Sequence, residues 1–242
     1  MTLYGVNRNT GEAVYLQITR ILEQEIKSSY DAGDYLSTEN ELAGRFSVNR
    51  HTIRHAIDEL VSAGVVERQH GRGTIVLGAA LNYRIGEHTR FTETLESLGK
   101  TTDTSIIRKI IVPARGGVAR RLNIDNETPV LMLETLRKVD DRPFCVISHF
   151  IPVNAYPEIE TDYLGGSLHA FFKQKLNISL LRKESLATAS IPIGDDASYL
   201  QVPQNFPILR VKSINIDADT KHPVEYSITR FRSDRVQLSF TP

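Results

Sequence analysis

The sequence ENELAGRFSVNRHTIRHAIDEL spans residues 39–60, and HGRGT follows at residues 70–74. The first stretch predicts two short helices joined by a tight turn. In the second helix, apolar residues recur at the spacing of one buried helical stripe; they are Ile53, Ala56, Ile57, Leu60 and Val61. The β-prone segments on either side of the Gly-x-Gly sequence predict a hairpin. Together these features indicate a winged helix-turn-helix, a fold that reads DNA.

Polar residues at the start of each helix match the expected caps. Thr38 and Glu41 have the spacing of a capping box, and Asn49 is a suitable N-cap for the second helix. That helix would enter the major groove with its N-terminal residues near base edges. Arginine suits this place because its planar fork can bind guanine O6 and N7 together. The residues predicted to take part in DNA binding are Thr38, Asn49, Arg50, Thr52, Arg54, His55 and, at the hairpin tip, Arg72 and Gly73.

An ordinary helical hairpin with a solvated, charged face is the alternative interpretation. The overall charge does not decide between the two, because 29 Lys and Arg balance 29 Asp and Glu. The local distribution favours DNA binding, since residues 47–57 contain arginine and histidine but no acidic residue.

The length of 242 residues fits two domains. We expect a winged helix-turn-helix domain at 11–79, a linker at 80–86 and a second domain at 87–242. Cys145 is the only cysteine, so no disulfide can form within the chain, and a cytoplasmic location is expected. The first twelve residues lack the apolar core of a signal peptide. No apolar run approaches the roughly 20 residues that span a bilayer, so no membrane partner is expected.

Beyond residue 87, strand-like runs alternate with short helical stretches, and residues 140–143 form a turn signal. Strands paired by turns, with helices between them, favour an α+β fold with a mainly antiparallel sheet. The sequence shows no glycine-rich phosphate loop of the usual types and no nucleophile elbow. His149, His169 and His222 are scattered without a metal-ligand spacing. We therefore expect no metal, no cofactor and no enzymatic activity.

Glycine and serine at residues 165–167 precede a helical stretch that begins at Leu168. Free N–H groups at such a start, together with the helix dipole, suit a phosphate or a similar anion. A plain N-cap is the alternative role of these residues. The helix near Thr92 would offer a second anion cradle, and Arg137 could complete a charge-assisted clamp.

The N-terminal motifs closely resemble those of the GntR family of bacterial transcription regulators. The matching pieces are YLQI at residues 15–18, ELAGRFSVNRHTIRHAIDEL at 41–60 and GRGTIV at 71–76. One departure lies at residues 36–39, where the family's proline is absent and threonine replaces serine. The resemblance covers about residues 11–79 and implies a DNA-binding domain.

The remaining sequence resembles the effector-sensing domain of the HutC subfamily, which shares its fold with chorismate lyase. The matching stretches are FTE at residues 91–93, LRKVDDRPF at 136–144, GSL at 166–168 and PVEYSITRFRSDR at 223–235. By this resemblance, the residues around the effector are Thr92, Arg137, Ser167, Glu225 and Phe231. Thr135 replaces a family arginine, and His169 replaces an aromatic residue at a further effector position. Both departures suggest a changed ligand.

Over its whole length, the chain is similar to HutC-type regulators of phosphonate uptake and degradation genes. This resemblance implies a cytoplasmic homodimer that represses transcription from a palindromic DNA operator. It also implies release by a small phosphorus-bearing anion such as a phosphonate. A sugar phosphate or another acidic metabolite is the alternative effector. Two other interpretations stay open: an enzyme of the chorismate-lyase kind fused to a DNA anchor, and a DNA-binding protein without an effector.

Overall fold

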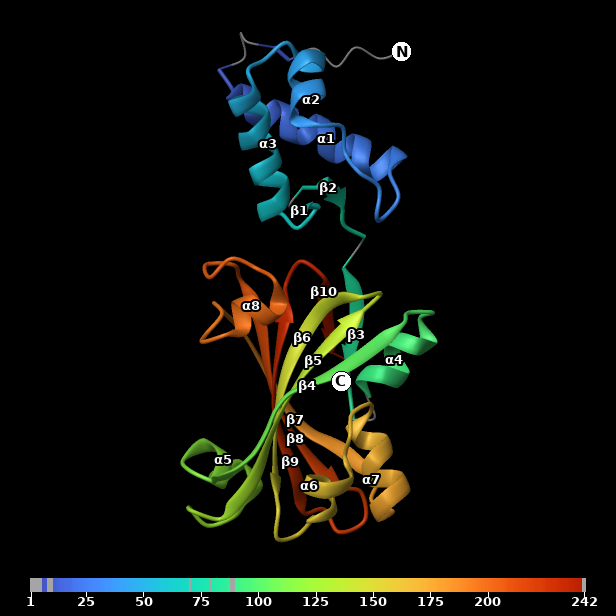
Figure 1. Ribbon diagram of the computed structural model, residues 1–242, viewed down its shortest axis with the longest axis vertical. Helices are drawn as coiled ribbons and strands as arrows, with labels where there is room; N and C mark the ends of the chain where they lie inside the picture. The colour runs from blue at the N-terminus through green and yellow to red at the C-terminus, as the bar shows by residue number, and fades with distance from the viewer. Residues whose placement is uncertain (1–5, 8–10, 70, 79, 88–89, 241–242) are drawn as a thin grey trace. The chain divides into compact units, whose positions relative to one another are not determined.

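The computed structural model describes residues 6–7, 11–69, 71–78, 80–87 and 90–240 of the chain. The chain divides into two compact units, Met1–Leu81 and Asn82–Pro242. Figure 1 labels the helices and strands of both units, which are described separately below.

The first unit consists of helices followed by a short hairpin. Its elements are α1 (Val14–Ser29), α2 (Glu39–Phe46), α3 (Arg50–Ser62), β1 (Val66–Gln69) and β2 (Gly73–Val76). The strands β1 and β2 pair in antiparallel fashion. This order confirms the predicted winged helix-turn-helix.

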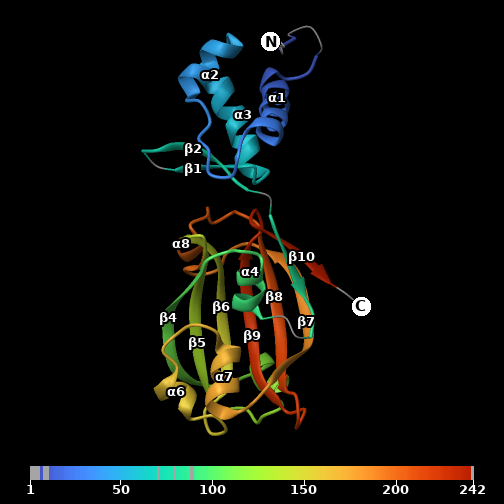
Figure 2. The same cartoon turned by 90° about the vertical axis from the view of Figure 1, so that its right-hand side faces the viewer.

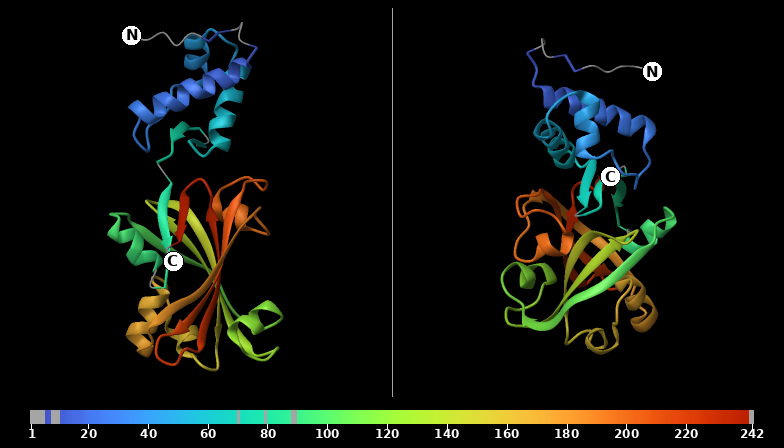
Figure 3. Two further views of the ribbon diagram at one scale, coloured as in Figure 1. Left: turned by 180° about the vertical axis from the view of Figure 1, so that it is seen from behind. Right: turned by 45° about the horizontal axis from the view of Figure 1, so that its top comes forward.

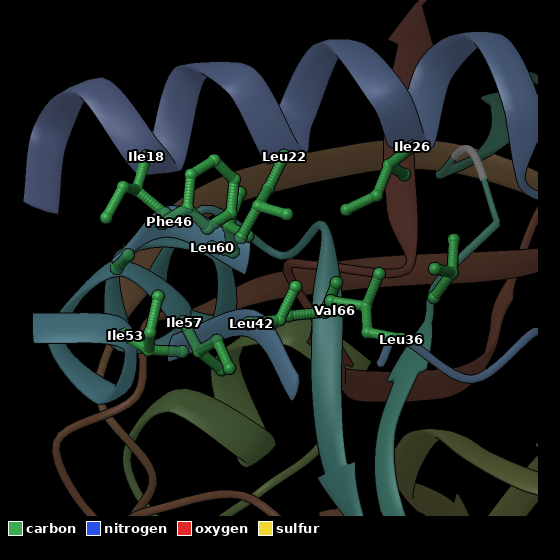
Figure 4. Close-up of a cluster of buried hydrophobic side chains, with 12 residues drawn as sticks. Ile18, Leu22, Ile26, Leu36, Leu42, Phe46, Ile53, Ile57, Leu60 and Val66 are labelled. Carbon is green, nitrogen blue, oxygen red and sulfur yellow. The ribbon is translucent and has the colours of Figure 1, made fainter. Parts of the chain in front are cut away.

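The apolar stripe of α3 forms the centre of this unit. Ile53, Ala56, Ile57 and Leu60 have no exposed surface, and Val61 is partly buried against the same cluster. Burial of one large aliphatic side chain contributes about 1.5–3 kcal/mol, so this stripe holds the helices together. The residues of α1 that point into the cluster are Ile18, Leu22 and Ile26 (Figure 4).

Local hydrogen bonds fix the turn between α2 and α3. At the start of α2, the backbone N–H of Thr38 donates to Glu41 Oε2 at 2.7 Å, and the Glu41 N–H donates to Thr38 Oγ1 at 3.3 Å. Ser47 ends α2 in a left-handed conformation with a φ of 52°. Asn49 Oδ1 then accepts the N–H of Thr52 at 2.8 Å. The predicted capping box and N-cap are both confirmed.

The second unit has an α+β fold around an antiparallel sheet. The six strands of the sheet lie in the order β4-β5-β6-β9-β8-β7. They are β4 (Thr102–Pro113), β5 (Pro129–Val139), β6 (Arg142–Pro152), β9 (Pro223–Arg232), β8 (Ile208–Asp217) and β7 (Leu180–Ser190). Each pair of neighbours is antiparallel, which confirms the predicted fold class.

The turn between β5 and β6 is also as predicted. Asp140 and Asp141 both have positive φ, 49° and 61°. Two successive residues of this kind form the tight turn that matches the twist of a hairpin, and aspartate tolerates the conformation better than most residues.

Short helices lie on both faces of the sheet. They are α4 (Phe91–Ser97), α5 (Gly117–Leu122), α6 (Glu158–Asp162), α7 (Leu168–Leu176) and α8 (Asp196–Leu200). Figure 1 and the left view of Figure 3 show α4 and α7 on one face and α5 and α8 on the other. Figure 2 looks onto the face covered by α4, α6 and α7, called here the α7 face. Because side chains alternate along a strand, each strand contributes every second residue to this face.

Strand β3 (Leu81–Ile85) lies inside the segment that the sequence predicts as a linker, and it pairs with β10 (Val236–Phe240). Tyr83 and Ile85 are buried, with 3% and 6% exposure, while Asn82 and Arg84 are exposed. The small residues before Leu81 favour a linker, but the alternation that follows them is that of a half-buried strand.

No helix among the described residues combines the length and the apolar character needed to cross a membrane.

Candidate functional site

A groove in the first unit is bounded by the starts of α2 and α3 and by the β1–β2 hairpin. Five of the residues predicted to bind DNA line it: Thr38, Arg50, Arg54, Arg72 and Gly73. Arg50 and Arg54 project from the same side of α3 because they are four residues apart. Their side chains are 58% and 48% exposed, so both guanidinium groups are open to a ligand in solution. Arg68 of β1 also lines the groove, although the sequence analysis did not select it.

A single carboxylate joins the arginines of this groove. Glu39 Oε2 accepts from Arg50 Nε at 2.8 Å and from Arg54 Nη2 at 3.1 Å. Arg68 Nη2 lies 3.9 Å from the other carboxylate oxygen. The hydrogen bond from Arg54 is the main cause of a lowered pKa at Glu39, with a smaller contribution from Arg50; partial burial opposes the shift. Glu39 therefore stays ionised and holds both α3 arginines at the groove.

The other three predicted residues have different surroundings. Asn49 and Thr52 form the cap of α3, where Asn49 Oδ1 also accepts from the Thr52 hydroxyl at 3.0 Å. The ring of His55 stacks on Tyr15 of α1, with centroids 3.7 Å apart and planes inclined by 10°. None of these three is among the residues that line the groove. Their part in DNA binding remains a prediction.

A cavity on the α7 face of the second unit brings together all six residues predicted to surround an effector. Its lining includes Thr92, Arg137, Ser167, His169, Glu225 and Phe231. They come from α4, β5, β9, α7 and the residue that caps the start of α7, so only the folded chain assembles them. The cavity has a volume of about 50 Å³.

Arginine side chains supply the donors of this cavity. Arg137 is 3% exposed. Its Nη1 donates to the hydroxyl of Thr104 and, at 2.9 Å, to the carbonyl of Gly166. Arg182 of β7 lines the same space. The Nε atoms of both arginines are buried and have no hydrogen-bond partner among the described residues.

The start of α7 borders this donor group. Ser167 Oγ accepts the N–H of Ala170 at 3.2 Å, so the plain N-cap role is present. Ser167 also lines the cavity. The carbonyl of Gly166 accepts from the Tyr163 hydroxyl at 2.9 Å as well as from Arg137. The Gly-Gly-Ser turn therefore connects the helix start to the arginine.

Glu225 provides a buried negative charge in the same cavity. It is 1% exposed, yet its pKa is lowered to about 2. Burial opposes this shift, but the charge and hydrogen bond of His149 outweigh it, with a further hydrogen bond from Asn215. Nδ2 of Asn215 donates to Glu225 Oε2 at 2.6 Å, and His149 Nδ1 bonds the other oxygen. Glu225 is consequently an anion at neutral pH.

His169 lines the cavity in a different protonation state. Desolvation lowers the pKa of His169 to about 4, and the nearby arginines Arg182 and Arg90 act in the same direction, against the attraction of Glu225. The imidazole is therefore neutral at pH 7. It can accept or donate a hydrogen bond there without adding positive charge.

Cys145 lacks the properties of a catalytic nucleophile. The thiol is fully buried, and burial raises its pKa to about 12. Since the thiolate is the reactive form, this side chain is inert at neutral pH.

The cavity also contains residues that were not predicted from the sequence, among them Tyr83, Arg182 and Asn215. Tyr83 lies in the segment taken as a linker. Arg182 lies outside the stretches that resemble the HutC subfamily. Asn215 also lies outside these stretches, and its position between Ile214 and Ile216 is the signal that could have marked a buried polar group.

Comparisons with known proteins agree with both halves of this description. Residues 14–76 match the model of bacterial regulatory proteins of the gntR family, and residues 97–237 match the UTRA domain. The chain is 34% identical over 226 residues to the probable transcriptional regulator PhnF of Escherichia coli K12, covering 93% of each chain. It is 29% identical over 237 residues to a probable fructoselysine utilization operon transcriptional repressor of the same strain, covering 97% of each.

Solved structures show the same architecture. The crystal structure of PhnF from Mycobacterium smegmatis is similar, with a TM-score of 0.65 and 25% identity over 93% of this chain and 98% of that chain. The crystal structure of a possible transcriptional regulator, YydK, from Bacillus subtilis shares the fold, with a TM-score of 0.58 and 17% identity over 94% of this chain and 98% of that one.

Proposed function

Since this chain belongs to the GntR family of bacterial regulatory proteins and carries a UTRA domain, it is a transcriptional regulator of the HutC type and not an enzyme, and we propose that it represses phosphonate uptake and degradation genes. In this proposal the protein is a cytoplasmic homodimer, and each winged helix-turn-helix binds one half-site of a palindromic operator. A small phosphorus-bearing anion binds in the cavity of the second unit and releases the operator.

The observation that carries this proposal is that two arginines, Arg137 and Arg182, line that cavity. Arg137 and Arg182 each keep one buried donor without a partner among the described residues. A buried donor that remains unsatisfied costs roughly 1–3 kcal/mol, and guanidinium donors form their strongest hydrogen bonds with carboxylate or phosphate oxygens. The cavity therefore favours an anion with several oxygens.

The size of the cavity supports a small anion. Its volume of about 50 Å³ is enough for a few water molecules. An alkylphosphonate requires less rearrangement of this space than a sugar phosphate does. The choice of phosphonates among small phosphorus compounds rests on the resemblance to regulators of phosphonate genes. A sugar phosphate stays the alternative, because a relative is described as a fructoselysine operon repressor.

The chain itself offers a route between the two sites. Strand β3 directly follows the DNA-binding unit in the sequence, and its residues Tyr83 and Ile85 line the cavity. A ligand that displaces these side chains would move the first strand after the DNA reader. The size of the resulting population shift is limited by the difference in effector affinity between the two states.

Fluorescence anisotropy on the DNA upstream of the neighbouring genes tests the proposal. Methylphosphonate, inorganic phosphate and glucosamine 6-phosphate are titrated into the protein–DNA complex at one fixed salt concentration, because DNA affinity depends steeply on salt. Release by the phosphonate alone supports the proposal. Release only by the sugar phosphate favours the alternative effector, and binding that ignores all three compounds contradicts the effector assignment.

In this experiment, the variant Arg137→Ala distinguishes effector binding from DNA binding. We expect it to bind operator DNA as the wild type does and to lose release by phosphonate. Arg115→Ala is the matched control, because Arg115 is exposed and paired with Glu127 on the surface of the same unit. Normal release from the Arg137→Ala variant would remove this residue from the effector site.

A further inference from the structure

Three residues that line the cavity on the α7 face each have a buried polar atom without a hydrogen-bond partner among the described residues. On the donor side are the Nε atoms of Arg137 and Arg182. On the acceptor side is Oδ1 of Asn215, which is buried and also lacks a partner among the described residues. Arg137 and Asn215 are 3% and 2% exposed, so bulk water does not compensate for the missing bonds. A ligand that satisfies the whole cavity must offer acceptors to one group and donors to the other.

The orientation of the Asn215 amide follows from its neighbour. An ionised carboxylate only accepts hydrogen bonds, so the amide must turn its Nδ2 toward Glu225, where it lies 2.6 Å from Oε2. Oδ1 is then left without a partner. The unmet acceptor is a consequence of the anion at Glu225 and not of an arbitrary amide assignment.

Glu225 itself can accept more than it does. Its carboxylate offers about four lone-pair sites, and the described residues use two of them, through His149 and Asn215. Glu225 lines the same cavity as the arginines. An ammonium group has three donors and a positive charge, which match one carboxylate and one amide oxygen.

A simple anion leaves this acceptor side unsatisfied. A dianion that binds Arg137 and Arg182 also brings its charge into a cavity that already contains the Glu225 carboxylate. Like charges in a poorly hydrated space repel strongly. His149 already bonds one oxygen of Glu225. A positive group on the ligand, placed against the same carboxylate, weakens the remaining repulsion and occupies the free lone-pair sites.

We propose that the effector is a zwitterion, an aminoalkylphosphonate whose phosphonate group binds Arg137 and Arg182 and whose primary ammonium group binds Glu225 and Asn215. This inference rests on the proposed function, because it names the chemical class of the effector for the same cavity. The proposed function requires only a phosphorus-bearing anion, and the zwitterion carries an ammonium group in addition.

Isothermal titration calorimetry on the full-length chain tests this inference with matched ligands. The first is 2-aminoethylphosphonate, and the second is n-propylphosphonate, in which a methyl group replaces the ammonium. We expect the amino compound to bind at least about tenfold more tightly, which corresponds to about 1.4 kcal/mol. Equal affinities, or tighter binding of n-propylphosphonate, would overturn the zwitterion while leaving a phosphonate effector in place.

Two further ligands identify the anionic group. β-Alanine carries the same ammonium with a carboxylate in place of the phosphonate, and glucosamine 6-phosphate is an amino compound with a phosphate ester. We expect both to bind more weakly than 2-aminoethylphosphonate. Tighter binding of either one would overturn the aminoalkylphosphonate. If none of the ligands binds while operator binding is intact, the proposed phosphonate effector fails as well.

The variant Glu225→Gln tests the ammonium contact directly. It keeps the shape of the side chain and removes its charge, so we expect the preference for the amino compound to fall by tenfold or more, while n-propylphosphonate binds at least as well as before. Glu134→Gln is the control, because Glu134 is a carboxylate paired with Arg230 in a different cavity. An unchanged preference in a folded Glu225→Gln protein would overturn the contact, and the wild-type comparison stands even if that variant does not fold.

Discussion

The carboxylate of Glu39 lies among the arginines of the DNA-binding groove, where a negative charge weakens attraction to phosphate. Its hydrogen bonds with Arg50 and Arg54 offer a reason for this carboxylate in the groove. A paired arginine has fewer accessible orientations, so less conformational entropy is lost when it meets a base edge. Glu39 would thus lower the affinity for DNA of any sequence and raise the ratio of operator affinity to random-DNA affinity.

Replacing Glu39 with glutamine should therefore separate affinity from specificity. We expect Glu39→Gln to tighten binding to random DNA, to steepen the salt dependence by up to about 0.9 in log–log slope, and to lower the ratio of operator to random affinity. Anisotropy over a salt series measures all three quantities. Glu23→Gln is the matched control, because Glu23 pairs with Lys27 on α1. An unaltered ratio would show that Glu39 does not position the arginines for base reading.

Arg54 is the residue that we expect to contact a base. Arg54→Ala should weaken operator binding by about 1–3 kcal/mol and leave binding to random DNA less affected. Arg20→Ala serves for comparison, since Arg20 lies on α1 and pairs with Glu12. Equal losses on both DNAs, with a shallower salt slope, would assign Arg54 to a phosphate instead.

Among the elements, α3 depends on its cap as well as on its buried stripe. Asn49→Ala removes the acceptor for the Thr52 N–H and should cost about 1 kcal/mol of unfolding free energy, measured by urea denaturation of the full chain. Asn49→Ser retains a capping oxygen and should cost much less. Similar losses in both variants would mean that Asn49 contributes by something other than capping.

The elements also show how far the sequence could be interpreted. The helices of the first unit were predictable because their periodicity and caps are local signals, and the hairpin turn at Asp140 and Asp141 is local too. Strand β3 was not, because small residues precede it and its partner β10 is far away in the sequence. A short stretch of residues does not indicate which distant segment it will pair with.

The same distinction applies to the cavity. Local helix-start and charge signals indicated Thr92, Arg137 and Ser167, while His169, Glu225 and Phe231 came from the resemblance to HutC-type regulators. The structure brings all six together. Arg182 and Asn215 lie on β7 and β8, and only the register of the sheet pairs Arg182 with Asn215 and Asn215 with Glu225. In the groove, the link from Glu39 to Arg50 and Arg54 likewise spans eleven and fifteen residues.

At the scale of the whole molecule, release of the operator by an effector requires that ligand binding in the cavity and DNA binding in the groove influence each other. If the effector lowers operator affinity by a certain factor, thermodynamic linkage demands that the operator lowers effector affinity by the same factor. Couplings of this kind typically amount to about 5–150-fold. Strand β3, which follows the DNA reader and lines the cavity, is the element through which we expect the coupling to act.

The most direct test is therefore calorimetric titration of 2-aminoethylphosphonate into the free protein and into the protein saturated with operator DNA. The account predicts weaker binding to the DNA complex, by the same factor that anisotropy gives for the loss of operator affinity at saturating ligand. Equal ligand affinity in the presence and absence of operator would contradict it, because a ligand that does not distinguish the two states cannot release the DNA.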